Sequence, residues 1–66
     1  MQVKCTKKTA VYTAAGKLES GRYIAPGDVC QLETAVTAAL LLPITYPAGK
    51  TQRRAYIRDL GNFLPA

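Results

Sequence analysis

The residues with the clearest chemical potential lie near the carboxyl end, where Arg54, Tyr56 and Arg58 alternate with Ala55 and Ile57. In a β-strand this alternation places the two arginines and the tyrosine on one face and the two apolar residues on the other. An aromatic ring between two guanidinium groups is a suitable platform for an anionic polymer or a nucleic-acid strand. The alternative interpretation is a solvated outer face without a ligand.

Four tyrosines are the other side chains suited to binding, since tryptophan and histidine are both absent. Each offers a flat apolar ring with a polar tip, which suits sugar rings, peptides and bases. Tyr12 and Tyr23 flank a long segment between two expected strands, and we predict that they contact a ligand together with Tyr56. The alternative is that these rings fill or border the core. The predicted ligand-binding residues are therefore Tyr12, Tyr23, Tyr56, Arg54 and Arg58.

The residue types that catalysis needs are largely missing. Cys5 and Cys30 lack a histidine to act as their general base. Asp28 and Asp59 fall in expected turns, so the four carboxylates are hard to assemble into an acid–base pair. Residues 49–51 (Gly-Lys-Thr) resemble only the tail of a phosphate-binding loop and lack its upstream glycine. The sequence predicts that the protein is not an enzyme and uses no cofactor.

The two cysteines also argue against a metal site. A structural zinc site needs about four cysteine or histidine ligands, which one chain does not supply. Neither Cys5 nor Cys30 lies in a Cys-x-x-Cys motif, so a thioredoxin-like redox motif is absent. We expect both to be reduced and to behave as small buried side chains. The alternative is one disulfide, if the first strand pairs beside the strand that follows Gly27.

Length and charge restrict the class of protein. A chain of 66 residues makes one domain, residues 1–66. Nine lysines and arginines against four acidic residues give a net charge of +5, which favours anionic partners, although solubility alone explains such a charge equally well. The longest apolar run, residues 38–44, is far shorter than the roughly 20 residues of a membrane span. The start after Met1 is polar and basic, so no secretory signal is visible.

Short β-strands separated by turn signals are the elements expected to position these residues. Val3 and Cys5 alternate with polar neighbours, which indicates a half-buried first strand. Pro26 and Gly27 fit the centre of a type II turn that Asp28 would cap or close. The expected strands are residues 2–6, 10–13, 23–24, 29–33, 42–46 and 53–58, with a hairpin loop at 48–52.

The segments between these strands are expected to be irregular. Residues 18–21 are expected to continue a loop within a long excursion from residue 12 to residue 23. Residues 34–42 are expected to form a loop or distorted turn that leads into a strand. Pro43 and Pro47 lie in or beside that strand, which favours an edge strand or a bulge.

The carboxyl-terminal residues are expected to close the structure. Residues 59–63 read as a short 3₁₀ turn that returns Leu60 and Phe63 to the core. Together the elements predict an all-β domain, a small barrel of five or six short antiparallel strands with a 3₁₀ turn near its carboxyl end.

Three short motifs and two apolar anchors follow the order seen in a known domain family. The motifs are residues 24–29 (Ile-Ala-Pro-Gly-Asp-Val), 44–47 (Ile-Thr-Tyr-Pro) and 55–57 (Ala-Tyr-Ile), with Leu60 and Phe63 as anchors. Over roughly residues 3–63 the chain thereby resembles the bacterial SH3 domains (SH3b) common at the ends of cell-wall hydrolases and phage endolysins. It departs from that pattern at residues 13–17, where the Asn-Val-Arg motif of many members is missing.

The resemblance implies an SH3-like barrel that targets peptidoglycan or a related cell-wall peptide or glycan polymer without catalysis. It also implies a cell-wall or extracellular location. One alternative is a small basic nucleic-acid-binding SH3-like barrel, because residues 27–29 also resemble the strand entry of KOW-type barrels. A second alternative is a phage structural or assembly protein that self-associates through the apolar residues 35–42.

Overall fold

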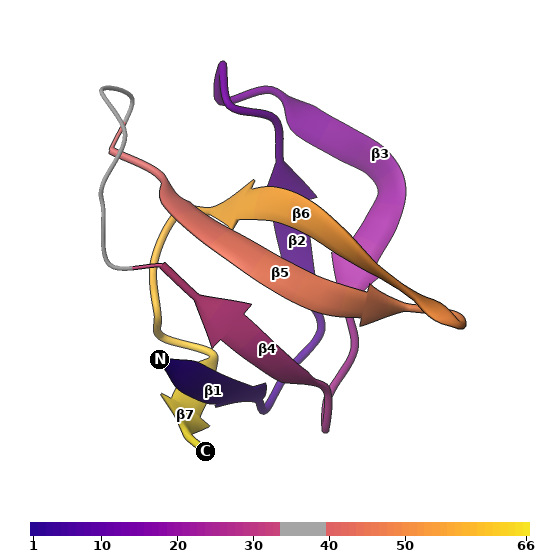
Figure 1. Cartoon of the computed structure of the whole chain (residues 1–66). Coiled ribbons are helices and arrows are strands. Elements are labelled where there is room, and N and C mark those ends of the chain that lie inside the picture. The colour runs from indigo at the N-terminus through magenta and orange to yellow at the C-terminus, as the bar shows by residue number, and fades with distance from the viewer. Residues whose placement is uncertain (34–39) are drawn as a thin grey trace.

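Seven antiparallel strands form one curled sheet in the computed structural model, which describes residues 1–33 and 40–66 (Figure 1). The strands are β1 (Gln2–Cys5), β2 (Thr9–Tyr12), β3 (Leu18–Ile24), β4 (Val29–Leu32), β5 (Leu42–Ala48), β6 (Thr51–Ile57) and β7 (Phe63–Pro65). Their order across the sheet is β3-β2-β6-β5-β4-β1-β7, so β3 and β7 are its edges. No helix occurs in the described residues. The all-β prediction is confirmed, although the strands number seven rather than five or six.

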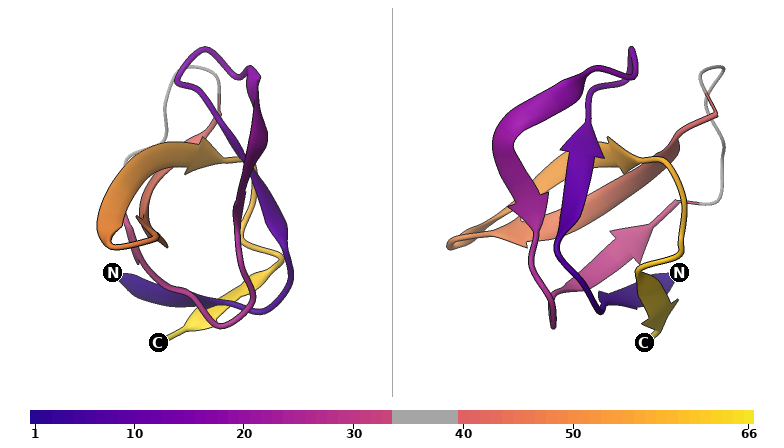
Figure 2. Two further views of the ribbon diagram at one scale, coloured as in Figure 1. Left: turned by 90° about the vertical axis from the view of Figure 1, so that its right-hand side faces the viewer. Right: turned by 180° about the vertical axis from the view of Figure 1, so that it is seen from behind.

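The sheet curls into a half-barrel, which Figure 2 shows in its left-hand view. The long β5–β6 hairpin crosses the middle of the sheet and reverses at the two-residue turn Gly49–Lys50. Strand β1 pairs with both β4 and β7, so the two chain ends lie near each other (Figure 1). The curl allows one face of every strand to contribute to a shared interior.

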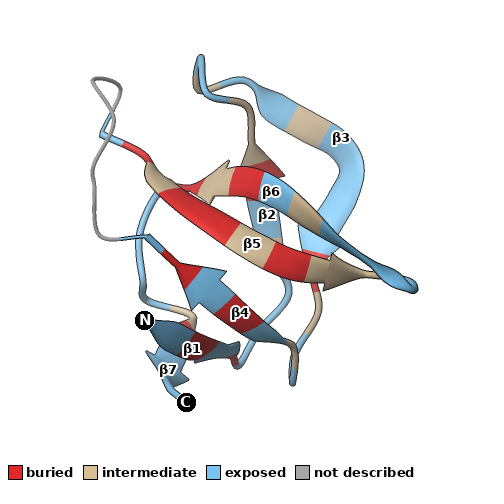
Figure 3. Cartoon of the chain, viewed as in Figure 1, coloured by how far each residue is buried: buried red, intermediate tan, exposed pale blue. Residues whose placement is uncertain are grey.

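Buried residues alternate with more exposed ones along several strands (Figure 3), and their side chains pack together as the core of the curled sheet. On β1, Val3 and Cys5 are buried between exposed neighbours, and on β4 Cys30 and Leu32 follow the same pattern. These alternations agree with the sequence prediction, because one face of each strand meets solvent. Among the described residues no polar or charged residue is buried. The buried residues of the core are Val3, Cys5, Val11, Ile24, Cys30, Leu32, Leu41, Ile44, Tyr46, Ala55, Ile57 and Phe63, and Pro43 of β5 is buried as well.

Both cysteines are free and buried, as predicted. The strand pairing that the disulfide alternative required does occur, since β1 lies beside β4. However, Cys30 pairs with Val3 in the register, and the Cys5 amide donates to the Asp28 carbonyl (2.9 Å). The two cysteines are therefore diagonal neighbours on adjacent strands rather than directly opposed residues. The Cys5 thiol donates instead to the carbonyl of Lys7 (2.8 Å).

The turn at Pro26 and Gly27 has the predicted form. The Asp28 amide donates to the Ala25 carbonyl (3.1 Å), and Gly27 has a φ of 92° at the third position of the turn. A type II turn requires this left-handed conformation, which glycine adopts without a steric penalty. Asp28 also closes the turn through its side chain, which accepts a hydrogen bond from the Ala25 amide (3.0 Å).

Pro43 and Pro47 lie in β5, an interior strand with continuous register against β6, so the prediction of an edge strand or bulge is wrong. The Pro43 carbonyl accepts a hydrogen bond from the Glu33 amide beside β4 (3.0 Å). The backbone N and carbonyl of one strand residue point toward the same neighbouring strand, so Pro43 directs its nitrogen toward β4. Pro47, four residues later, has the same orientation. The described pairs between β4 and β5 involve Ile44 and Thr45, between the two prolines. Neither proline therefore interrupts that pairing.

Residues 18–21 belong to strand β3, so the prediction of an irregular loop is wrong. Only Ile24 at the end of β3 is buried, and most of its other residues are exposed. Without a buried face the segment carries no alternation from which a strand could be predicted. It is an edge strand that bends strongly along its length (Figure 1).

The carboxyl-terminal anchor differs from the prediction in two ways. A single hydrogen-bonded turn, in which the Phe63 amide donates to the Leu60 carbonyl (3.0 Å), replaces the expected 3₁₀ segment and leads directly into β7. Phe63 is buried as expected, but Leu60 is 39% exposed. Pairing of β7 with β1 therefore anchors the end of the chain, with Phe63 opposite Cys5.

The expected loop at 34–42 and the expected self-association through 35–42 fall mostly on residues 34–39, outside the described part of the chain. The residues that follow are described. Leu40 is 76% exposed, whereas Leu41 is buried.

Candidate ligand-binding site

Three of the predicted binding residues share the outer face of β2, β3 and β6. Tyr12 of β2 lies directly opposite Tyr56 of β6, and both side chains are half-buried. Ala10 pairs with Tyr23 of β3 and precedes Tyr12 by two residues, so Tyr23 lies on the same face as Tyr12. We call Tyr12, Tyr23 and Tyr56 the tyrosine face. The sheet thus brings together residues from three separate strands.

Cations lie over two rings of the tyrosine face. The Arg58 guanidinium carbon is 4.6 Å from the centroid of the Tyr12 ring, and the Lys8 amine is 4.5 Å from that of Tyr23. Such contacts are electrostatically favourable and fix the position of the cation. Tyr12, Lys8 and Arg58 also border a hollow of about 160 Å³. This face therefore combines aromatic surface with positive charge, and Arg58 lies over Tyr12 of β2.

Arg54 has a different role from Arg58. Its guanidinium pairs with the Glu33 carboxylate across the outer surface at 2.8 Å. Both side chains are about half exposed, at 58% and 48%, so the pair contributes little to stability. The predicted platform of two arginines around Tyr56 is thus only partly free for a ligand, because Arg54 is held by Glu33.

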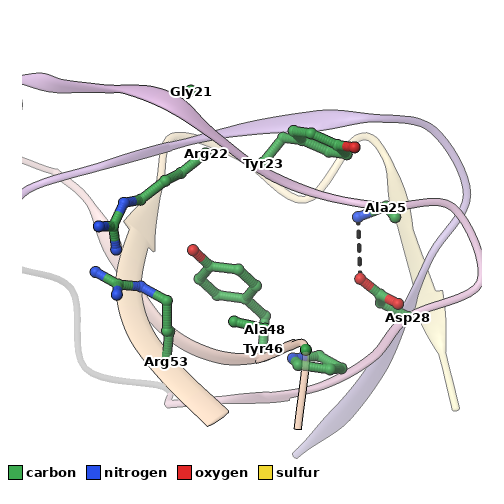
Figure 4. A pocket seen from close by; sticks show the side chains of 10 residues that line it. Gly21, Arg22, Tyr23, Ala25, Asp28, Tyr46, Ala48 and Arg53 are labelled. Carbon is green, nitrogen blue, oxygen red and sulfur yellow. Dashed lines mark hydrogen bonds between the residues drawn. The ribbon is translucent and has the colours of Figure 1, made fainter. Parts of the chain in front are cut away.

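A larger cavity of about 560 Å³ lies between β3 and the β5–β6 hairpin (Figure 4). Arg22 and Arg53 extend beside the Tyr46 ring, and their guanidinium groups point toward one another (Figure 4). Tyr23 and Asp28 border the same cavity. We call this cavity the arginine pocket. Tyr23 belongs to the tyrosine face and is also one of the residues that line the arginine pocket.

A β-bulge in β3 includes Arg22, which precedes the buried Ile24 by two residues and therefore shares its inward face. Ala10 pairs with Tyr23 and Tyr12 pairs with Leu18, so residues 19–22 lie opposite a single residue of β2. A bulge of this kind bends the strand and redirects its side chains. Gly21, at its centre, has a φ of 77°, a left-handed conformation that glycine adopts readily.

Tyr46 and Arg53 are opposed partners on β5 and β6 and face the inside of the curl. Tyr46 is 2% exposed and belongs to the core. The Nε atom of Arg53 is buried and has no hydrogen-bond partner in the described structure. Most buried donors in proteins have an acceptor, so the unpartnered Nε–H group of Arg53 is an exception. A ligand with an acceptor atom would satisfy it.

Charges around the arginine pocket act on the Tyr46 hydroxyl. Burial raises its pKa above the usual value, and the nearby Glu19 carboxylate raises it further. The Arg22 guanidinium opposes both effects. The hydroxyl therefore stays protonated at neutral pH and is available as a hydrogen-bond donor.

Asp28 supplies a carboxylate at the far side of the arginine pocket from the two arginines (Figure 4). One of its oxygens accepts the hydrogen bond from the Ala25 amide, so the side chain is fixed in the turn. The pocket therefore has a positive end and a negative end. This polarity would orient a bound group that carries a charge.

The prediction from sequence did not include Arg22, Tyr46 or Arg53 among the binding residues. For Arg53 a signal existed, because it shares the alternation of Ala55 and Ile57, which are both buried. A charged residue in the buried phase of a strand indicates a polar site on the inner face. For Arg22 the signal was weaker, because it shares the phase of the buried Ile24 two residues later while residues 18–21 show no alternation.

The described residues contain no group of three or more histidine, cysteine or acidic side chains that could hold a metal ion. No helix in that part of the chain is long and apolar enough to cross a membrane. Comparisons with models of protein families, with curated proteins and with solved structures found no match.

Proposed function

We propose that the chain is a non-catalytic binding module with an SH3-like barrel, and that it attaches to peptidoglycan or a related cell-wall polymer. The observation that carries this proposal is the tyrosine face, which gathers three partly or largely exposed rings from three strands. Small curled sheets of short antiparallel strands serve mainly as binding scaffolds. The seven-strand half-barrel is consistent with the barrel that the sequence motifs imply.

Cell-wall glycan and peptide suit the chemistry of this face. Sugar rings present apolar C–H faces and polar hydroxyls, which match the flat face and polar tip of tyrosine. Tyr23 is 49% exposed and is the most exposed of the three tyrosines, with Lys8 over one face of its ring. Lys8 and Arg58 add donors for carboxylate or hydroxyl groups beside these rings. We therefore expect Tyr23 and Tyr12 to make the main contacts.

Sedimentation with purified Gram-positive peptidoglycan at physiological salt tests this function. We expect the wild-type protein to sediment with the wall and Tyr23→Ala to sediment much less. Lys50→Gln is a matched control, since Lys50 lies in the hairpin turn away from the tyrosine face. Circular dichroism confirms that the variants are folded. Wild-type protein that stays in the supernatant would count against the proposal.

A nucleic-acid-binding barrel is the second candidate, because Lys8 and Arg58 lie against the same rings. Aromatic rings with neighbouring cations are also suited to stacking bases and neutralising phosphates. Salt separates the two functions. Binding to a single-stranded oligonucleotide would weaken steeply between 50 and 200 mM salt, roughly tenfold or more for each few phosphate contacts. Such binding without wall sedimentation would favour this candidate.

A further inference from the structure

We infer that the arginine pocket is a binding site for an oxyanion, a carboxylate or a phosphate group, held between Arg22 and Arg53. This inference concerns a different surface from the tyrosine face and does not rest on attachment to a cell wall. Carboxylate and phosphate share the feature that matters here, which is a set of negatively charged acceptor oxygens.

The two arginines converge without a partner. Their guanidinium groups point toward one another in the arginine pocket (Figure 4). Within residues 1–33 and 40–66 neither one forms an ion pair or a hydrogen bond, and the ion pair of that region joins Arg54 to Glu33. Two like charges in one partly enclosed cavity repel each other, and an anion between them would remove that repulsion.

None of the four acidic side chains of the sequence, all of which lie in the described part of the chain, forms an ion pair with Arg22 or Arg53. Glu33 is held by Arg54, and Asp59 accepts a hydrogen bond from the Gly61 amide. Asp28 is fixed in its turn on the opposite side of the pocket. Glu19 is close enough to influence Tyr46, yet it forms no ion pair with either arginine of the pocket. The positive end of the pocket therefore lacks an internal counterion.

Arg53 supplies an independent indication of a missing acceptor. Its Nε–H group is buried and unpartnered, although it opposes the core residue Tyr46 across the β5–β6 hairpin. A guanidinium group presents donors in a planar fork that matches two oxygens of a carboxylate or phosphate. The Tyr46 ring lies beside Arg22 and Arg53, and its hydroxyl offers a further donor (Figure 4).

The test follows the Nε–H signal of Arg53 by nuclear magnetic resonance in the ¹⁵N-labelled full chain. Inorganic phosphate and acetate are titrated separately at constant ionic strength, against chloride. We expect one or both to shift this signal in a saturable manner. The stronger probe identifies the phosphate or the carboxylate class. Arg22→Gln should weaken binding about tenfold or more, as expected for loss of a charge-assisted contact.

Arg54→Gln is the matched control, because it removes the same charge from an exposed outer position. It should leave the phosphate and acetate titrations unchanged. Equal weakening by Arg54→Gln and Arg22→Gln would show only a general effect of net charge and would overturn the site. Linear shifts without saturation would overturn it as well. Failure of wall sedimentation would remove the proposed function but would not affect these outcomes.

Discussion

Tyr46 and Arg53 face one another across the β5–β6 hairpin on the inner side of the sheet, where the ring is 2% exposed and the arginine Nε is buried without a partner. The apolar core therefore borders the charged side chain of Arg53, which lines the arginine pocket. This junction joins the residues that stabilise the fold to those that we infer to bind an anion. It has consequences for stability that can be measured separately from binding.

Two substitutions of Tyr46 should distinguish the contribution of its ring to stability from that of its hydroxyl. The ring is part of the core, so Tyr46→Ala should lower the free energy of unfolding by about 3–5 kcal/mol. The hydroxyl makes no hydrogen bond within the described structure, so Tyr46→Phe should change stability by less than about 1 kcal/mol. Urea unfolding measures both. A large loss in Tyr46→Phe would mean that the hydroxyl has a structural partner.

Gly21→Ala should destabilise the protein and disturb the bulge in β3. Space is available at this position, because an added Cβ would meet no atom within 4 Å. The cost comes instead from the φ of 77°, which an alanine adopts at a penalty of about 1–2 kcal/mol. Ser20→Ala, one residue earlier, is the control. Thermal unfolding of both variants tests this account. Equal stability of Gly21→Ala and Ser20→Ala would contradict it.

Asp28→Ala should weaken the turn between β3 and β4. The carboxylate accepts a hydrogen bond from the Ala25 amide, and loss of such a charged acceptor costs about 1–3 kcal/mol. Asp28→Asn retains an acceptor oxygen and should recover part of the loss. Chemical denaturation of the two variants gives the comparison, and identical losses would assign the effect to the charge rather than to the hydrogen bond.

The free energy of unfolding should decrease at alkaline pH because the Cys30 thiol ionises. Burial, together with the Asp28 carboxylate and the Cys5 thiol nearby, raises the pKa of Cys30 from 9.0 to about 11. The folded protein binds the Cys30 proton more tightly than the unfolded chain does. The thiol therefore contributes its full stabilisation to the free energy of unfolding below pH 9, and this contribution is lost as the pH rises through about 11. The slope should approach about 1.4 kcal/mol per pH unit within that window.

Urea unfolding at several values between pH 8 and pH 11 checks this dependence. Cys30→Ala is the control, since it removes the thiol and should show a shallower decline. The raised pKa of Tyr46 adds a loss in the same direction above pH 10, and this remains in both proteins. Parallel curves for the two proteins would assign the whole decline to Tyr46 or to other groups.

Local patterns in the sequence predicted much of the fold. The alternation of Val3 with Cys5 and of Cys30 with Leu32 identified buried strand faces, because a strand exposes every second residue to the same side. The turn at Pro26 and Gly27 was also predictable, since few residues other than glycine accept a positive φ. These features depend on neighbouring residues alone.

Pairing between distant strands decided the rest. Strand β3 lacked an alternating pattern over most of its length, and its bulge exists only in register with β2. The interior position of Pro43 and the approach of Arg22 to Arg53 likewise depend on how the sheet curls. Local patterns therefore predicted the faces of β1 and β4, the turn at Pro26 and Gly27, and the net positive charge. Tertiary structure alone decided where that charge converges, because the curl brings the edge strand β3 up to the β5–β6 hairpin.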